Sequence, residues 1–173
     1  MFLNKIKVFL LISISLIFFF LTYNDVKSQE LEIIEGKAIV VDGDTIKING
    51  EKIRFSGIDA PESYYKGKEQ LCFKDEKKIS CGKISKVFLI KIINNQTVKC
   101  VIEVKTDRYK RKLGECFVED KSLSRILVKS GYAFDYPRYS KKKYLKEQEY
   151  AKKNSLGLWN MKFNFPWDFR KNN

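Results

Sequence analysis

Several carboxylates and one guanidinium lie close together in the stretch VVDGDTIKINGEKIRFSGIDAPE, from Val40 to Glu62. The side chains of interest are Asp42, Asp44, Asp59, Glu62 and Arg54. Paired aspartates and backbone carbonyls supply the oxygen ligands that hard divalent cations such as calcium prefer. A carboxylate beside such a cation can orient or deprotonate a water, and a guanidinium can stabilise negative charge that develops on a phosphate. The stretch therefore holds the residue types that metal-assisted phosphodiester cleavage needs.

Each of these motifs also has a simpler structural interpretation. Asp-Gly-Asp-Thr and Asp-Ala-Pro-Glu are ordinary turn sequences, and a lone arginine on the polar face of a strand is usually solvated. The chain contains no histidine, which excludes Ser-His, Cys-His and His-metal chemistry. Catalysis would have to rest on carboxylates, Lys, Arg, Tyr, Cys or a metal bound by oxygen. The combination of acidic and basic residues around one hairpin favours a site over a set of unrelated turns.

The hairpin DTIKINGEKIRF is expected to bring the acidic residues together. Asn49-Gly50 is a favoured two-residue turn, because both positions tolerate positive φ. Pairing across it places Asp44 opposite Phe55 and gives the hairpin one apolar face, formed by Ile46, Ile48, Ile53 and Phe55, and one basic face, formed by Lys47, Lys52 and Arg54. Asp44 begins one strand and Asp59 follows the other, so the two should be neighbours. Regular pairing leaves Arg54 and Asp44 on opposite faces, so a shared site requires a bend, which Gly43 and Gly57 would allow.

A second hairpin is expected in VKCVIEVKTDRYKRKLGECFVE, with the basic loop Thr106 to Arg111. In that loop a base could stack on Tyr109 while Arg108 holds a phosphate. Folding about the loop places Cys100 near Cys116, which predicts a disulfide worth about 3 kcal/mol in the loop-entropy model. Cys72 and Cys81 would then pair with each other. Zinc binding by the cysteines is the alternative, although the spacing contains no C-x₂-C pair.

Periodicity and capping residues predict three helices. The first covers residues 83–93, with Ile84, Val87, Phe88 and the stem of Lys91 facing inward. The second begins at the N-cap Ser122, presents Leu123, Ile126 and Leu127, and ends at Gly131. The third runs from Ser140 to Asn154, with Tyr144, Gln148 and Ala151 spaced by helical turns. Trp159 and Trp167 are expected to pack back on the body. A curled sheet with helices alongside is an α+β arrangement, a small closed barrel plus helices.

Charge and the N-terminal segment indicate the setting. The 173 residues point to one domain, and the formal charge of +13 favours a polyanionic partner, either nucleic acid or an anionic membrane. MFLNKIK followed by VFLLISISLIFFFL, Val8 to Leu21, is typical of a signal peptide, with Val26 and Ser28 at a plausible cleavage site. We expect residues 1–28 to be that signal and 29–173 an exported domain, periplasmic or secreted. The alternative is an uncleaved anchor through residues 8–23.

The motifs VVDGDTIKI, IRFSGIDAPE and TDRYKR, in this order, resemble those of the staphylococcal nuclease (thermonuclease) family. The later ILVKSGYA and EYAKKNSLGLW resemble the C-terminal helices of that family. The resemblance implies an α+β fold, a five-stranded OB-fold β-barrel with three α-helices. It also implies a calcium-dependent nuclease that hydrolyses phosphodiester bonds of DNA and RNA and leaves 3′-phosphate ends.

The resemblance also assigns roles to individual residues. Asp44, Asp59 and the backbone carbonyl of Ala60 resemble the calcium ligands, and Glu62 resembles the general base. Arg54 and Arg111 resemble the phosphate-binding arginines, and Arg108 and Tyr109 the contacts to a terminal phosphate and the nucleotide. Lys110 stands where the family usually has a glycine, which bears on how the backbone aims Arg111.

Two alternative functions belong to other classes. A non-catalytic OB-fold module that binds nucleic acid would be expected to have lost one or more of these side chains, and none is lost. A basic envelope protein held to anionic lipid would use a segment such as SKKKYLKEQEYAKK, but that function leaves the carboxylates unexplained. We expect DNA and RNA as substrates, no obligate protein partner, a monomer, and membrane contact only if the N-terminal segment stays uncleaved.

Overall fold

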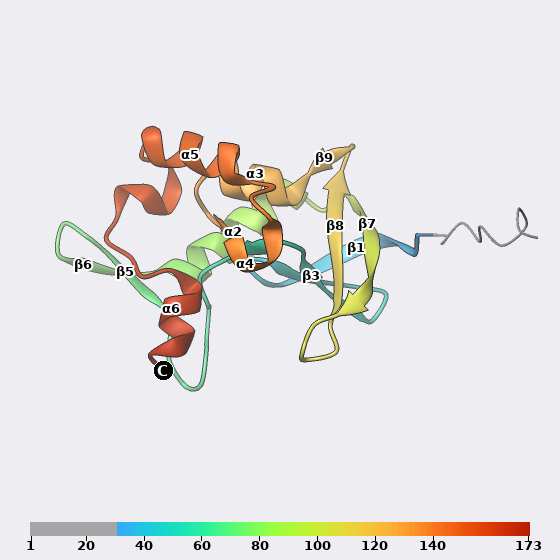
Figure 1. The fold of residues 1–173 in the computed structure, drawn as a ribbon, viewed down its shortest axis with the longest axis horizontal. Coiled ribbons are helices and arrows are strands. Elements are labelled where there is room, and N and C mark those ends of the chain that lie inside the picture. The colour runs from blue at the N-terminus through green and yellow to red at the C-terminus, as the bar shows by residue number, and fades with distance from the viewer. Residues whose placement is uncertain (1–30) are drawn as a thin grey trace, which may run out of the picture. The chain divides into compact units, whose positions relative to one another are not determined.

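The computed structural model, which describes residues 31–173, contains a closed barrel with helices beside it (Figure 1). The strands of the barrel are β1 (Ile33–Asp42), β2 (Thr45–Ile48), β3 (Glu51–Phe55), β7 (Thr97–Thr106) and β8 (Lys112–Val118), in the order β3-β2-β1-β7-β8. A parallel pairing of β3 with β8 closes the sheet, and the short β9 (Lys121–Ser122) pairs antiparallel with the end of β8. The predicted signal or anchor segment lies outside the described residues. Leu31–Asn173 form one compact unit.

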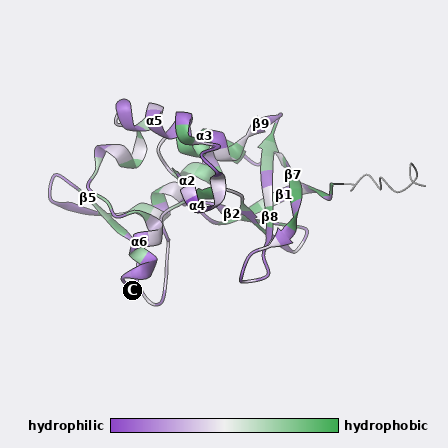
Figure 2. Cartoon of the chain, viewed as in Figure 1, coloured by the Kyte–Doolittle hydropathy of each residue, from purple (hydrophilic) through white to green (hydrophobic). Residues whose placement is uncertain are grey.

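The predicted hairpin faces and the OB-type barrel are confirmed. Ile46, Ile48, Ile53 and Phe55 are all buried, and Asn49 (φ 50) and Gly50 (φ 90) form the turn. Figure 2 shows hydrophobic residues along the barrel strands and on the neighbouring helices α2 (Cys81–Ile93) and α3 (Leu123–Lys129), whereas α5 (Leu145–Lys153) is mostly hydrophilic. The apolar faces of the sheet and of these two helices form the main core.

Both predicted disulfides are present. Cys100 pairs with Cys116 between β7 and β8, in the cross-strand register that the hairpin predicts. Cys72 pairs with Cys81 and ties the strand pair β5 (Leu71–Lys74) and β6 (Lys77–Ser80) to the first residue of α2.

The predicted inner face of the first helix is partly wrong. Val87 is 62% exposed and Lys91 is exposed, whereas Ser85, Leu89 and Ile93 are buried. Ile84 and Phe88 are half-buried, as an inward face requires. The helix begins at Cys81, which is bonded to Cys72, and its apolar residues between Ile84 and Ile93 offer more than one possible face.

The second and third helices differ in how well they follow the prediction. Ser122 caps α3 as expected, since its side chain accepts a hydrogen bond from the Arg125 N–H. The single helix predicted from Ser140 is wrong, because the structure has a short α4 (Pro137–Ser140) and a separate α5. Lys141 (φ 52) and Lys142 (φ 67) adopt the left-handed conformation between them, which ends one helix before the next begins.

A second core lies beside the barrel, where the C-terminal tail packs back as predicted. It contains Cys72, Cys81, Phe134 and Leu158, together with Trp159, Phe163, Phe165 and Trp167 around them. Two short strands, β4 (Ile58–Asp59) and β10 (Phe134–Asp135), pair here and connect this core to the barrel. The tail continues through η1 (Gly157–Asn160) into α6 (Pro166–Lys171).

Helix α6 is held by stacked rings. The Trp167 ring stacks on Phe165 at 4.6 Å between centroids and on Tyr136 at 5.1 Å. Figure 1 shows α6 and the C-terminus beside the loop that follows β4, and the Lys68 Nζ bonds the Asn173 side chain at 2.8 Å. Among the described residues, no helix has both the length and the apolar character needed to cross a bilayer.

Candidate functional site

The two ends of the first hairpin meet as the pairing predicts. The Phe55 N–H donates to the Asp44 carbonyl at 2.9 Å, and Arg54 pairs with Thr45. The register of β1 against β2 shifts between Val40 and Asp42, so Asp44 lies in the turn rather than in the regular strand. This bend removes the conflict in the regular pairing, because the Asp44 carboxylate now faces the Arg54 guanidinium.

Glycines permit the close packing at this bend. Gly57 adopts a φ of +72° in the turn after β3, a conformation in which glycine has no steric penalty. A Cβ atom at Gly43 would lie 2.8 Å from the Ala60 Cβ and 2.9 Å from the Ser85 Cβ, closer than carbon atoms pack. The turn that carries Asp44 therefore rests directly on α2 and on the segment after β4.

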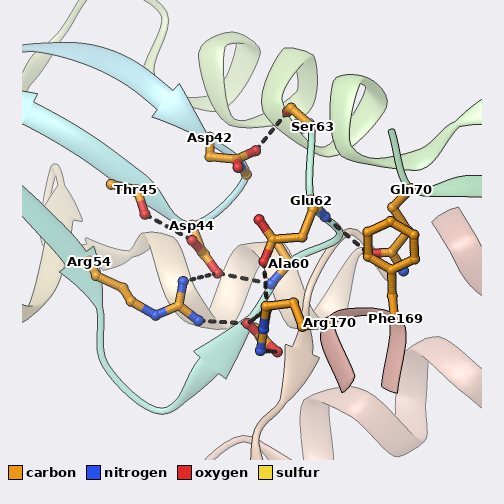
Figure 3. Close-up of polar contacts among 12 residues, drawn as sticks. Asp42, Asp44, Thr45, Arg54, Ala60, Glu62, Ser63, Gln70, Phe169 and Arg170 are labelled. Atoms are coloured by element: carbon orange, nitrogen blue, oxygen red, sulfur yellow. Dashed lines mark hydrogen bonds and ion pairs between the residues drawn. The ribbon is translucent and has the colours of Figure 1, made fainter. Parts of the chain in front are cut away.

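Arg54 bridges the two predicted metal-binding aspartates (Figure 3). Its Nη1 lies 2.6 Å from Asp44 Oδ2, and its Nη2 lies 2.6 Å from Asp59 Oδ1. Both carboxylates are buried, and the Asp59 side chain has no exposed surface. Although burial opposes the charge, the neighbouring Asp44 and Asp59 carboxylates raise the pKa of Arg54 above its usual value. Burial raises the pKa of Asp59, and its arginine partners oppose that effect.

Asp44 is fixed by further donors. It accepts hydrogen bonds from the Thr45 hydroxyl at 2.9 Å and from the Ala60 N–H at 3.0 Å. Ala60, predicted as a carbonyl ligand, therefore contacts Asp44 through its N–H. The part that its carbonyl plays stays a prediction.

Glu62 is positioned through contacts of its own main chain. Its N–H donates to Gln70 Oε1 at 3.0 Å, and its backbone packs on the first turn of α2. A Cβ atom at Gly82 would lie 2.2 Å from the Glu62 carbonyl carbon, so only glycine allows this approach. Burial, with added repulsion from Asp44 and Asp42, raises the pKa of Glu62 to about 7, whereas Arg170 acts to lower it.

Arg170, from α6, is a site residue that the sequence motifs do not indicate. Its Nη1 lies 2.6 Å from Glu62 Oε1 and 3.1 Å from Asp59 Oδ1, and its Nη2 lies 2.6 Å from Asp59 Oδ2 (Figure 3). The only sequence signal nearby is Pro166 at the start of a short helix, in a tail whose aromatic residues require it to fold back.

Asp42 belongs to the edge of the same site. Its Oδ1 accepts a hydrogen bond from the Ser63 hydroxyl at 2.7 Å and from the Gly43 N–H at 2.9 Å. Burial and the Asp44 charge raise the pKa of Asp42. These contacts fasten the turn after β1 to the residue that follows Glu62.

Asp107 organises the second hairpin loop, which contains Lys110. Asp107 accepts hydrogen bonds from the N–H groups of Tyr109 and Arg111, and its Oδ2 pairs with the Arg111 Nε at 2.7 Å. Lys110 has a φ of 59°, in the left-handed region that glycine adopts readily. The Tyr109 ring contacts both Arg108 and Arg111, whose guanidinium carbons lie 4.7 Å and 5.4 Å from the ring centroid.

One cleft of about 800 Å³ joins these groups. It brings together most of the predicted site residues and Arg170, and it is also lined by three further aromatic or basic side chains from the segment around α4: Tyr136, Arg138 and Tyr139. The predicted residues on its wall are Asp44, Arg54, Glu62, Arg108, Tyr109 and Arg111. Asp59 does not line the cleft, but it contacts the cleft residues Arg54 and Arg170.

The donor chemistry of Asp44 and Asp59 fits a hard divalent cation, since both are buried carboxylates that converge on one positive charge. Within residues 31–173, no group of three or more acidic, His or Cys side chains is arranged to bind a metal. Both aspartates are instead neutralised by guanidinium groups.

Comparison with known proteins identifies the family. Residues 52–161 match the family described as staphylococcal nuclease homologue. The chain is 31% identical over 119 residues to staphylococcal-like nuclease CAN1 of Arabidopsis thaliana, covering 68% of this chain and 32% of the relative. It is 38% identical over 132 residues to succinoglycan biosynthesis protein ExoI of Rhizobium meliloti, covering 74% of this chain and 65% of the relative. The chain thus spans about a third of the plant protein and just under two thirds of the bacterial one. With its closed barrel and its paired aspartates and arginines, the chain belongs to the staphylococcal nuclease family.

Proposed function

We propose that this chain is a calcium-dependent nuclease that hydrolyses phosphodiester bonds of DNA and RNA and leaves 3′-phosphate ends. One observation carries the proposal: Arg54, Glu62 and Arg111 line a single cleft, beside a buried pair of aspartates. Nuclease relatives and the family match support the class of reaction.

The arginines would bind the phosphate. Arg54 is held rigidly by two carboxylates, and Arg111 is held by Asp107, so both present their guanidinium groups in fixed positions. Positively charged donors placed in advance stabilise the charge that develops on the non-bridging oxygens. Arg108 and Tyr109, which are exposed at the mouth of the cleft, would contact the neighbouring nucleotide by charge and by stacking.

Glu62 would act as the general base. A pKa of about 7 places this carboxylate near the pH at which a base is most effective, and its burial keeps it out of bulk solvent. It would take a proton from a water that attacks phosphorus. The bond between phosphorus and the 5′ oxygen then breaks, the leaving 5′ oxygen takes a proton from solvent water, and the phosphate stays on the 3′ oxygen.

Asp44, Asp59 and the Ala60 carbonyl would hold calcium, which when bound would neutralise part of the phosphate charge. For the cation to reach Asp59, a contact of that carboxylate with an arginine has to be given up. Asp44 keeps its bonds from Thr45 and Ala60, so its carboxylate stays oriented.

We also propose that the protein acts outside the cytoplasm, after export. All cysteines of the described residues are in disulfides, which are typical of oxidising compartments and rare in reducing ones. The apolar N-terminal segment supports the same proposal.

A plasmid-degradation assay on residues 29–173, with calcium and with a chelator, tests the function. We expect degradation with calcium and none with the chelator. Glu62→Gln should lower turnover at least about a hundredfold, as the loss of a general base does, while calcium-dependent nucleotide binding is kept. Glu69→Gln is the matched control, since Glu69 bonds Lys83 and Ser80 away from the cleft.

Two results would count against the proposal. Wild-type turnover in Glu62→Gln would end the assignment of the base. A wild-type protein that binds DNA but never cleaves it would favour the non-catalytic OB-fold module instead.

A further inference from the structure

The cation that neutralises Asp59 and Glu62 in this structure is a side chain of the protein itself. We propose that Arg170 is an internal competitor for the divalent cation, and that the cation binds by displacing Arg170 together with α6. The inference rests on the proposed calcium dependence and adds a residue that no motif of the chain assigns.

Arg170, together with Arg54, donates hydrogen bonds to both carboxylate oxygens of Asp59. Oδ1 accepts from both Arg54 and Arg170, and Oδ2 accepts from Arg170 at 2.6 Å. Because the Asp59 side chain is fully buried, these arginine donors rather than bulk water satisfy its oxygens. A cation that binds an Asp59 oxygen must therefore replace an arginine contact. The positive charge of the guanidinium groups also repels the cation.

Arg170 is the arginine better placed to leave. Arg54 lies on β3, which pairs with β2 on one side and β8 on the other, and it also bonds Asp44, so removing it would disturb the hairpin. Arg170 lies on a helix of 6 residues at the surface, beyond the segment 52–161 that matches the family. Its guanidinium also holds Glu62 at 2.6 Å, so its departure would free the proposed base as well as Asp59.

The attachment of α6 is modest in extent. Besides the ion pairs of Arg170 itself, it consists of the contacts of Trp167 with Phe165, Tyr136 and Phe134, the buried Pro166, and exposed contacts of Lys66 and Lys68 with Asn173. Short helices that bury few side chains open more easily than core elements. A cation bound at Asp59 would shift α6 toward the open state. Because only open molecules bind the cation, its apparent affinity equals the intrinsic affinity multiplied by the fraction of molecules that are open.

Calorimetric titration of the purified protein with calcium chloride, in the absence of nucleotide, tests this competition. We expect Arg170→Gln to bind calcium at least about tenfold more tightly than the unchanged protein, because its binding site is already open. Arg170→Lys, which keeps the charge but not the two-pronged contact, should fall between them. Lys171→Gln is the matched control, since it removes the same charge from the exposed neighbouring position and should leave the affinity unchanged.

Hydrogen exchange of the unchanged protein gives a second measurement, which does not depend on any variant folding. Saturating calcium should increase amide exchange over residues 167–171, while exchange in α2 stays the same.

The outcomes separate the two proposals. Equal calcium affinity of the unchanged protein and Arg170→Gln would overturn the competition and leave the calcium-dependent nuclease standing. Tighter binding by the variant without any calcium-induced exchange in α6 would overturn the displacement. Absence of calcium binding in every folded variant would overturn the calcium dependence, and the competition with it.

Discussion

Replacing Arg54 with methionine would leave two buried carboxylates without the cation that lies between them. Asp44 and Asp59 have 6% and 0% of their side-chain surface exposed, and each is 2.6 Å from an Arg54 nitrogen. Removing one partner of a buried ion pair costs about 3–5 kcal/mol, because the charge left behind is poorly solvated. Asp59 keeps Arg170, so we expect the lower end, about 3 kcal/mol.

Urea denaturation at neutral pH with a chelator present measures this loss. For a domain of this size 1 kcal/mol lowers the melting temperature by about 2–4 °C, so thermal unfolding should shift by about 10 °C. Adding Asp44→Asn to Arg54→Met removes one of the unpaired charges and should restore part of the stability, which reveals a coupling between the two sites. Arg138→Met is the control, since Arg138 lines the same cleft but forms no ion pair within residues 31–173.

A loss below about 1 kcal/mol for Arg54→Met would refute the reasoning, since that is the range of exposed ion pairs. A double variant that is less stable than the single one would refute it too, because the Asp44 charge would then not be the source of the cost.

Three further predictions concern pH, the basic loop and the second core. The folded pKa of Glu62, about 7, exceeds its ordinary value of 4.5, so its stability contribution is present below pH 4.5 and is lost as the pH rises through 7. This loss is at most about 3 kcal/mol, and urea denaturation of chelated protein should show a flatter pH profile for Glu62→Gln; identical profiles would contradict it. Lys110→Gly should raise the free energy of unfolding by about 0.5–1 kcal/mol, because Lys110 has a φ of 59° that glycine adopts more readily, and nuclease activity should persist. A loss of stability in this variant would mean that the lysine side chain makes a favourable contact. Phe134→Ala should cost about 3–5 kcal/mol in thermal unfolding, since Phe134 is fully buried among four aromatic rings, and a cost below 1 kcal/mol would show that this cluster adds little to stability.

Local signals in the sequence predicted the barrel well. The Asn49-Gly50 turn and the alternation on both sides of it fix the register, so the burial of Ile46 and Phe55 followed directly. The register of the second hairpin likewise placed Cys100 opposite Cys116.

The remaining features depend on tertiary contacts. The buried face of α2 could not be predicted from its sequence alone, because apolar residues lie on more than one side of the helix and the buried side includes Ser85. Lys141 and Lys142 adopt positive φ although lysine carries no local preference for it, so the break before α5 was unpredictable. Arg170 reaches Asp59 from 111 positions away, and no spacing rule connects residues so far apart.

The position of Glu62 depends on the absence of a side chain at Gly82. Gly82 brings helix α2 against the main chain of Glu62 so closely that one added methyl group would push this segment outward. A related chain could thus carry every acidic and basic residue of the motifs and still be inactive, if position 82 held alanine. The presence of the acidic and basic residues alone is therefore not enough to predict activity in such chains, because the packing that positions the Glu62 segment depends on a glycine outside those motifs.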